Sequence, residues 1–381
     1  MKSVGIICEY NPFHNGHLYH LEKVKELYPN YTIILIMSGS FTQRGDASII
    51  NKWDKTSIAL NYGVDIVIEL PYVFATESAD KFAHASIELL DYMGVEAIVF
   101  GSESNNIDKL YELAKIQLNN KKYDKLVKKY LDEGINYPTA LSKALYEITG
   151  KKIDKPNDIL ALSYIREIIK QESDIKPISI KRNNDYNSLE LNDGMTSASS
   201  IRYALYNKEN IENYIPEETE ECLDKPVFNQ DYFSLLKYKI LTEDDLSIYQ
   251  TVDEGIENRL KKYIVSSKTL DEFLLKIKTK RYTYNKLNRM FNHIICNFTK
   301  EEAERLNEIE YIRILGFSYK GQDYLNKNKK EIELPIITRF TNDYEMLNIE
   351  YRTTCVYATI MDEKDKIKLI ESEYKNPPII R

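Results

Sequence analysis

The sequence predicts an α/β fold: a Rossmann-like domain with a parallel sheet over residues 1–210, followed by a mostly helical domain over residues 211–381. Three observations support this prediction. Short β-branched apolar runs without polar alternation are typical of strands buried on both faces. Segments of helical length separate these runs, as right-handed βαβ units require. The length of 381 residues exceeds that of one typical domain.

The elements of the first domain follow from this pattern in chain order. The predicted strands are the apolar runs at residues 4–8, 32–37, 65–70 and 96–100. The helical segments that separate or follow them are residues 16–28, 52–62 and 77–92. Further along the chain we expect helices at 138–149 and 158–171 and one more strand at 175–180.

The second domain is predicted from an acidic boundary and a change of pattern. Seven acidic residues lie between Glu209 and Asp224, around Pro216, as expected of a solvated segment between two domains. Beyond it, residues 285–298 have the periodicity of an amphipathic helix, and residues 311–315 form a short apolar run typical of a strand.

Composition indicates a soluble, cytoplasmic protein. Hydrophobic residues make up 43% of the chain and charged residues 29%, as in globular proteins. The apolar run near the N-terminus is too short for a signal peptide or a membrane span. The cysteines form no close pair, which fits a reducing compartment and argues against a zinc ribbon; they are Cys8, Cys222, Cys296 and Cys355.

One strongly basic segment stands out in a chain whose net charge is −7. Residues 273–300 contain no aspartate or glutamate, and their basic side chains are interleaved with Tyr282, Tyr284 and Phe291. Lysine and arginine neutralise phosphates, and tyrosine stacks on unpaired bases, so the segment predicts contact with single-stranded RNA. A solvated helix face with aromatic residues in the core remains the alternative.

Three of the five histidines lie within seven residues of each other, at His14, His17 and His20, directly after the first predicted strand. Ligands of open α/β sheets bind at the carboxyl ends of strands. The helix expected to begin at Gly16 directs free N–H groups to that end, and His14 and His17 can add hydrogen bonds to phosphate oxygens. Structural histidines and a metal site are the alternatives; we discount metal because no supporting ligands are evident.

The loop "EYNPFHNGHLYHL" resembles the His-x-Gly-His loop of the nucleotidyltransferase superfamily, whose domains are Rossmann-like (HUP-type) and which includes class I aminoacyl-tRNA synthetases. In that superfamily the two histidines contact ATP phosphates. A later serine- and arginine-containing segment holds the pyrophosphate, and "MTSASSIRYAL", with Ser199, Ser200 and Arg202, is similar to it.

A closer resemblance, to the tRNA(Met) cytidine acetate ligase family, extends from the N-terminus to beyond residue 320. It rests on the stretches "CEYNPFHNGHLYHL", "MSGSFTQRGDASIINKWDKTSIAL", "GVDIVIELP", "FGSES", "KPNDILALSY", "TSASSIR", "RYTYNKLNRM" and "RILGFSYKGQDYL". The resemblance implies that members activate acetate with ATP to acetyl-adenylate and acetylate the wobble cytidine of elongator tRNA(Met).

Carried over by position, the resemblance implies catalytic roles for His14, His17 and Arg202. It implies ATP contacts for Gly101, Asn157 and Arg182 and for the loop residues Ile7, Cys8, Glu9, Tyr10, Asn11, Pro12, Phe13, His14, Asn15, Gly16, His17, Leu18, Tyr19 and His20. Mg²⁺ is expected to be held mainly by the phosphates, with no protein metal site. The segment "GDAS" departs from the family pattern Gly-Glu-Pro-Ala, so the role of Asp46 stays open.

The resemblance also assigns the basic segment to tRNA. The residues implied are Lys276, Lys278, Lys280, Arg281, Tyr282, Lys286 and Arg289, and we expect Arg313 on the same surface. Neither a membrane nor a stable protein partner is implied. Two other functions remain alternatives: a small-molecule adenylyltransferase that makes a dinucleotide cofactor, and a non-catalytic RNA-binding protein with a nucleotidyltransferase fold.

Overall fold

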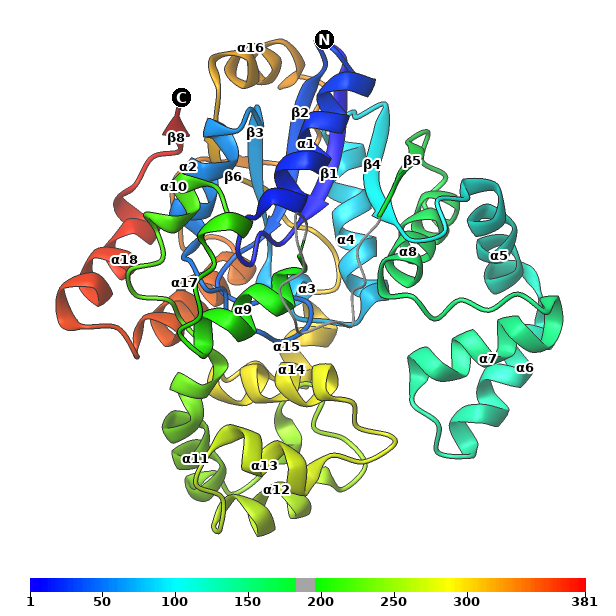
Figure 1. The fold of residues 1–381 in the computed structure, drawn as a ribbon, viewed down its shortest axis with the longest axis vertical. Coiled ribbons are helices and arrows are strands. Elements are labelled where there is room, and N and C mark those ends of the chain that lie inside the picture. The colour runs from blue at the N-terminus through cyan, green and yellow to red at the C-terminus, as the bar shows by residue number, and fades with distance from the viewer. Residues whose placement is uncertain (183–195) are drawn as a thin grey trace.

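The computed structural model describes residues 1–182 and 196–381, which surround one mixed eight-stranded sheet (Figure 1). The strand order is β5-β4-β1-β2-β3-β6-β7, and β8 pairs with β6. The strands are β1 Ser3–Cys8, β2 Thr32–Ser38, β3 Ile66–Leu70, β4 Ala97–Ser102, β5 Lys176–Lys181, β6 Ile312–Phe317, β7 Ile336–Ile337 and β8 Ile379–Ile380.

The five strands of the first domain are parallel and confirm the predicted fold class. β1 pairs with β2 on one side and with β4 on the other. From β1 the chain adds β2 and β3 on one side of the sheet and then crosses to add β4 and β5 on the other side. The strand order therefore reverses next to β1. In open α/β sheets, ligands bind at the carboxyl ends of the strands at such a point. The predicted strand boundaries agree with the observed ones to within one or two residues.

The helices cover both faces of the sheet and extend beyond it (Figure 1). Those of the first part are α1 Asn15–Leu27, α2 Lys52–Asn61, α3 Tyr72–Ala75, α4 Ala79–Tyr92, α5 Ile107–Asn119, α6 Lys121–Asp132, α7 Tyr137–Thr149, α8 Pro156–Lys170 and α9 Ala198–Tyr206. Those of the second part are α10 Glu217–Glu220, α11 Phe233–Thr242, α12 Ile256–Ile264, α13 Leu270–Ile277, α14 Tyr284–Ile295, α15 Lys300–Arg305, α16 Tyr319–Asn328, α17 Glu345–Ala358 and α18 Glu363–Lys375.

Two features of the helices differ from the prediction. Helices α5 and α6 were not predicted, because each buries only two or three side chains and its apolar stripe is sparse. The helix predicted at 77–92 begins later, at Ala79, because the Ser78 hydroxyl caps it by accepting from the backbone N–H of Lys81.

The last part of the chain returns to the sheet. Strand β6 pairs antiparallel with β3, and β7 and β8 then pair parallel to β6. The strand predicted at 311–315 therefore belongs to the same sheet as the strands before residue 210. The division into two domains at residue 210 remains a prediction. The sheet contains strands from before and after that residue.

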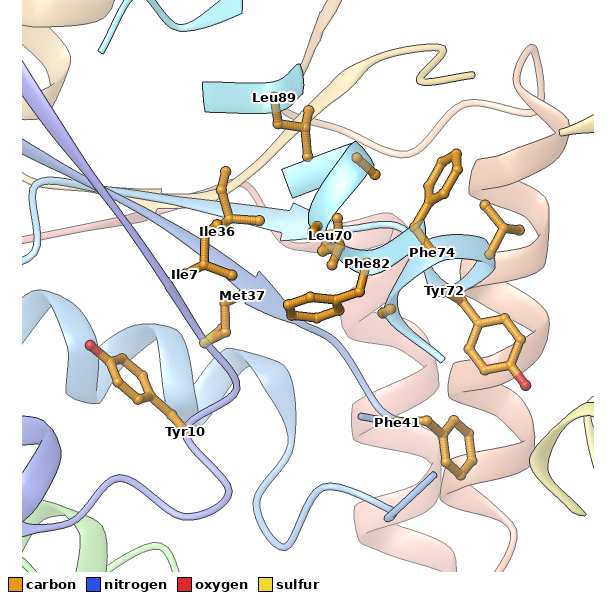
Figure 2. Close-up of a cluster of buried hydrophobic side chains, with 14 of the residues drawn as sticks. Ile7, Tyr10, Ile36, Met37, Phe41, Leu70, Tyr72, Phe74, Phe82 and Leu89 are labelled. Atoms are coloured by element: carbon orange, nitrogen blue, oxygen red, sulfur yellow. The ribbon is translucent and has the colours of Figure 1, made fainter. Parts of the chain in front are cut away.

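The core beneath the candidate site is apolar and closely packed. Figure 2 shows side chains from β1, β2, β3, α3 and α4 meeting in it, among them Ile7, Ile36, Leu70 and Phe82. Phe41, from the loop after β2, is 1% exposed, and its ring lies 6.0 Å from those of Tyr72 and Tyr357. This loop is therefore anchored in the core at its base.

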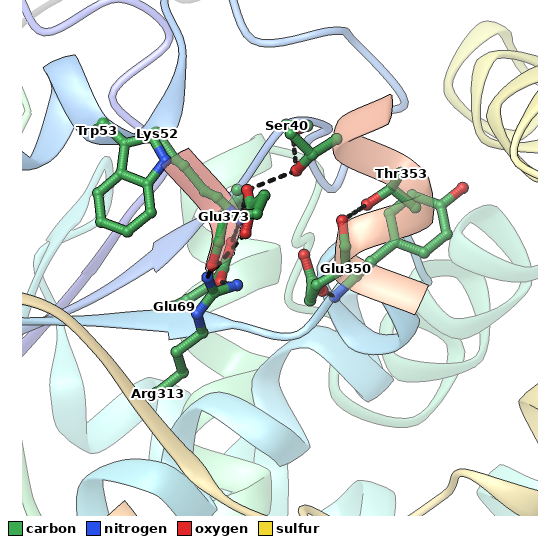
Figure 3. Close-up of polar contacts among 12 residues, drawn as sticks. Ser40, Lys52, Trp53, Glu69, Arg313, Glu350, Thr353 and Glu373 are labelled. Carbon is green, nitrogen blue, oxygen red and sulfur yellow. Dashed lines mark hydrogen bonds and ion pairs between the residues drawn. The ribbon is translucent and has the colours of Figure 1, made fainter. Parts of the chain in front are cut away.

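A buried ion network ties β3 and β6 to α2 and α18 (Figure 3). Lys52 Nζ lies 2.6 Å from carboxylate oxygens of both Glu69 and Glu373. Arg313 contacts the same two carboxylates, at 2.8 and 2.7 Å. The expectation that Arg313 lies on an RNA-binding surface is thus wrong: it is 4% exposed, because β6 is a sheet strand and its guanidinium neutralises buried carboxylates.

Within residues 1–182 and 196–381, no helix has both the length and the apolar character needed to cross a membrane.

Candidate active site

The loop between β1 and α1 shapes the first part of the site. His14 is the N-cap of α1: its Nδ1 accepts a hydrogen bond of 2.9 Å from the backbone N–H of Gly16. A Cβ on Gly16 would lie 2.7 Å from His14 Cε1, so a larger residue would displace the imidazole. The rings of His14 and His17 stack with their centroids 3.9 Å apart.

The histidines of this loop are neutral near pH 7. Burial, with Arg182 nearby, lowers the pKa of His14 to about 3 and that of His20 to about 4, and lowers the pKa of His17 well below its usual value. Because His14 Nδ1 accepts a hydrogen bond, the proton of the neutral ring is on Nε2. His14 can therefore donate a hydrogen bond to a ligand without carrying charge.

The predicted nucleotide contacts Gly101, Asn157 and Arg182 all line the same cavity as this loop, although they come from β4, the start of α8 and the residue after β5. Arg182 Nη1 donates to Asn157 Oδ1 at 3.1 Å, and Asn157 Nδ2 donates to Glu103 Oε1 at 2.7 Å. A Cβ on Gly101 would lie 2.9 Å from Arg182 Cδ, so glycine lets the arginine cross the strand end closely. Glu103 was missed; its place directly after "FGS" at a strand end was the available signal.

Arg202 reaches the same loop from α9. Its Nη1 donates to the backbone oxygen of Asn11 and its Nη2 to Asp46 Oδ2, both at 2.8 Å, and Nη2 also lies 3.3 Å from Ser199 Oγ. Asp46, whose role the sequence left open, thus holds Arg202. Asn229 was also missed: it donates to Asp46 Oδ1 at 3.3 Å and accepts from the N–H of Ala47 at 2.6 Å.

These elements line one cavity of about 820 Å³, large enough for a nucleotide with a second substrate. Of the loop residues predicted to contact ATP, ten line it: Ile7, Cys8, Glu9, Tyr10, Asn11, His14, Gly16, His17, Tyr19 and His20. The other four, Pro12, Phe13, Asn15 and Leu18, are not among its lining residues. Phe13, for example, stacks on Tyr62 with a centroid distance of 5.1 Å. The four residues therefore contribute to the shape of the turn and not to the cavity wall.

The basic segment divides between the cavity and the surface. Arg281, Lys286 and Arg289 line the cavity, whereas Lys278 and Lys280 are exposed on the outside. Lys276 is half-buried and pairs with Glu272 at 2.6 Å. Tyr282 is only 5% exposed and donates to the backbone oxygen of Asp253, so its ring does not face solvent as a stacking surface would.

The polar groups of this region are suited to phosphate more than to a metal ion. Among the described residues, no cluster of three or more histidine, cysteine, aspartate or glutamate side chains could hold a metal ion. The cavity instead offers neutral imidazoles, guanidinium groups and the N-terminus of α1, which are donors suited to phosphate oxygens. The arrangement can therefore bind a nucleoside triphosphate and stabilise negative charge that develops on its phosphate oxygens.

Comparison with known proteins agrees with this geometry. Residues 1–372 match the family model described as HIGH Nucleotidyl Transferase. The chain is 40% identical to the tRNA(Met) cytidine acetate ligase of Geobacillus sp. (strain WCH70), with all of both chains covered. It is 42% identical to the enzyme of that name from Fusobacterium nucleatum, with 91% of each chain covered.

Solved structures give the same result. The crystal structure of apo Thermotoga maritima TmcAL superposes with a TM-score of 0.92 at 31% identity, covering 100% of this chain and 99% of that one. The same protein bound with alpha-thio ATP has a TM-score of 0.88 at 32% identity, with the same coverage.

Proposed function

Because the chain belongs to the tRNA(Met) cytidine acetate ligases, a family with the HIGH nucleotidyl transferase domain, we propose that it is an ATP-dependent acetate ligase. Acetate and ATP give acetyl-adenylate and pyrophosphate, and the acetyl group then passes to the wobble cytidine of elongator tRNA(Met), forming N4-acetylcytidine. The observation that carries this proposal is the cavity that joins the His14–His17 loop, Arg202 and the basic face of α14.

The first step needs donors around the phosphates and no covalent protein nucleophile. Acetate attacks the α-phosphorus, and negative charge accumulates on the phosphate oxygens as pyrophosphate leaves. His14 and His17 supply uncharged N–H donors, Arg202 supplies a guanidinium fixed by Asp46, and the N-terminus of α1 supplies backbone N–H groups. We assign Asn157 and Arg182, with Gly101, to the nucleoside side of the same cavity.

Mg²⁺ accompanies ATP in this proposal, held mainly by phosphate oxygens and water. The uncharged and cationic donors of the cavity fit such a complex, since they contact phosphate and leave the ion to its own ligands. The ion would neutralise phosphate charge during pyrophosphate departure.

The second step requires tRNA to bring a cytidine into the cavity. We propose that the exposed Lys278 and Lys280, with Lys276, contact tRNA phosphates outside. Arg281, Lys286 and Arg289 contact the nucleotides that enter, and the cytidine leaves its loop stack to do so. The enzyme would act in the cytoplasm, with residues 1–210 as the catalytic domain, residues 211–381 as the tRNA-binding domain, and no stable protein partner.

The test uses purified protein, ATP, Mg²⁺ and isotopically labelled acetate, with and without elongator tRNA(Met). Labelled acetylcytidine in the digested tRNA, dependent on ATP, is the expected result. Acetate-dependent pyrophosphate exchange without labelled nucleoside would mean that acetyl-adenylate forms but that another acceptor takes the acetyl group. Pyrophosphate release that needs a different small molecule in place of acetate would mean a small-molecule adenylyltransferase. No exchange and no label would mean a binding protein without catalysis.

Two variants separate the steps. His17→Ala removes a phosphate donor and is expected to abolish pyrophosphate exchange. Lys278→Ala with Lys280→Ala removes two cations outside the cavity and is expected to spare exchange while weakening tRNA binding, more strongly at low than at high salt. Full exchange activity in the histidine variant would contradict the phosphate site.

A further inference from the structure

One lobe of the cavity, lined by Gln43, Glu77 and Arg289, has its own set of polar groups. It lies where β2 and β3 end and is closed by α14, which lies across the end of the sheet (Figure 1). Gln43 is at its centre: its backbone N–H donates to Glu9 Oε1 at 2.6 Å, and its side-chain Nε2 donates to the backbone oxygen of Glu77 at 3.1 Å. Glu77 is therefore only two hydrogen bonds from the ATP loop.

Two acidic residues of the cavity wall, Asp80 and Glu254, are each bound by a guanidinium, at 2.6 Å from Arg166 and 2.9 Å from Arg281. Glu77 is 4% exposed, and among the described residues its ion pair within 4 Å is with Lys81, at 3.5 Å. The Arg289 guanidinium lies near enough to interact with it electrostatically.

The Glu77 carboxylate is fixed in place by two further donors. Gln250 Nε2 donates to it at 2.5 Å, and the backbone N–H of Ser78 donates to it at 3.2 Å. A carboxylate has about four lone-pair positions, so it can still accept from a ligand.

Arg289 supplies donors beside this carboxylate. Its Nη1 donates to the backbone oxygen of Gln43 at 3.0 Å. Arg289 lines the same cavity, and its buried Nε has no hydrogen-bond partner within residues 1–182 and 196–381. A buried donor of a charged group is costly to leave unpaired, so this atom indicates that a ligand acceptor belongs there.

An acceptor next to a fork of donors complements a base edge that has an amine donor beside ring and carbonyl acceptors. Cytosine presents an exocyclic amine that donates, beside N3 and O2, which accept. Resting on the proposed function, we infer that this lobe binds the acceptor cytosine by its Watson–Crick edge. Glu77 accepts from the exocyclic amine, and Arg289 donates to N3 or O2. Uracil would instead place its O4 acceptor against the Glu77 carboxylate.

The same placement of Glu77 provides an acceptor for the proton that the cytosine amine loses during acetyl transfer. The cytosine N4 attacks the carbonyl carbon of acetyl-adenylate, a C–N bond forms, the C–O bond to the phosphate breaks, and AMP leaves. N4 gives up one proton, which the Glu77 carboxylate accepts and releases to water after the product departs.

The test measures cytosine selectivity and the two steps separately, using elongator tRNA(Met) transcripts with C or U at the acceptor position. In the native enzyme we expect the U transcript to bind at least 10-fold more weakly than the C transcript. In Glu77→Gln we expect that ratio to fall below 3, and acetylation of the C transcript to slow at least 100-fold. Pyrophosphate exchange should stay within twofold. Glu88→Gln, in helix α4 just beyond Glu77 and outside the cavity lining, is the matched control and should change none of these.

Each other outcome overturns the inference. An unchanged C-to-U ratio with unchanged acetylation removes Glu77 from the acceptor site, and an equal loss of exchange and acetylation gives it a structural role. If Glu77→Gln does not fold, Arg289→Lys keeps the charge but loses the fork, and a C-to-U ratio equal to the native one refutes the assignment. A native enzyme that acetylates cytidine while binding both transcripts equally refutes the inference alone. A native enzyme that acetylates no cytidine refutes the proposed function as well.

Discussion

Replacing Asp46 by asparagine tests whether the Asp46–Arg202 pair prepares the site for ATP. Arg202 has three acceptors, the Asn11 backbone oxygen, Ser199 and Asp46, and only Asp46 is charged. The side chains of the pair are 19% and 22% exposed, between the limits of a surface pair and a buried one. Hydrogen bonds to charged groups contribute about 1.5–3 kcal/mol and exposed pairs about 0–1 kcal/mol. We therefore expect a loss of about 1.5 kcal/mol.

That free energy corresponds to a decrease of roughly 10-fold in kcat/KM for ATP. The assay is acetate-dependent ATP–pyrophosphate exchange at varied ATP, which reports the first step without tRNA. Asp365→Asn, which breaks an exposed pair with Lys225, is the control and should leave the rate unchanged. A decrease of less than twofold in the Asp46 variant, with unchanged thermal stability, would refute the reasoning.

Three further predictions concern stability, measured as the free energy of unfolding in denaturant. Gly45→Ala should destabilise the fold by about 2–4 kcal/mol, because φ is +78° and the new Cβ would lie 2.3 Å from the backbone nitrogen of Arg289. Gly255→Ala, at φ +79° in open space, should cost only about 1 kcal/mol, and equal losses would contradict the packing argument. Arg313→Met should cost about 3–5 kcal/mol by leaving Glu69 and Glu373 undercompensated, and a neutral result would contradict the ion network. The pKa of His14 is lowered to about 3 from about 6.5 in the unfolded chain, so the unfolded chain takes up a proton first and stability falls as the pH drops through 6.5. Between pH 7 and pH 5.5 the native protein should therefore lose about 1 kcal/mol more than His14→Asn, and parallel pH profiles would contradict this.

Most of the sheet and half of the site could be predicted because their causes are local. The apolar run of β1, the turn after it and the cap of α1 are all encoded within about 25 residues, and the histidine spacing follows from that turn. A run such as that of β6 predicts a strand equally well. Its pairing with β3, more than 240 residues earlier, has no local signal, so the prediction could not place it in the sheet.

The rest of the site depends on contacts between distant segments. Arg202 and Asp46 are 156 residues apart in the chain, and Asn229 and Asp46 are 183 residues apart. Each is a polar residue in a loop or at a helix start, where many such residues have no partner. The basic segment differs in the opposite way. Its charge pattern predicted one basic surface, whereas Lys286 and Arg289, on α14, line the cavity and Lys280, in the loop before α14, is exposed.

The turn at residues 41–47 connects the two halves of the reaction. Phe41 anchors its base in the core, and the bridge between Phe41 and Ala47 makes it a narrow, defined turn (Figure 2). On its inner side, Gln43 binds Glu9 and Asp46 binds Arg202; on its outer side, Gly45 lets the backbone of α14 approach directly. This one turn therefore helps to position Glu9 and Arg202, which we assign to the ATP site, and Arg289 of α14. Asp46 belongs to this turn, whereas Glu77 contacts it only through the Gln43 side chain. Substitutions at Asp46 and at Glu77 are therefore expected to separate adenylate formation from acetyl transfer, whereas a change at Gly45 should affect both.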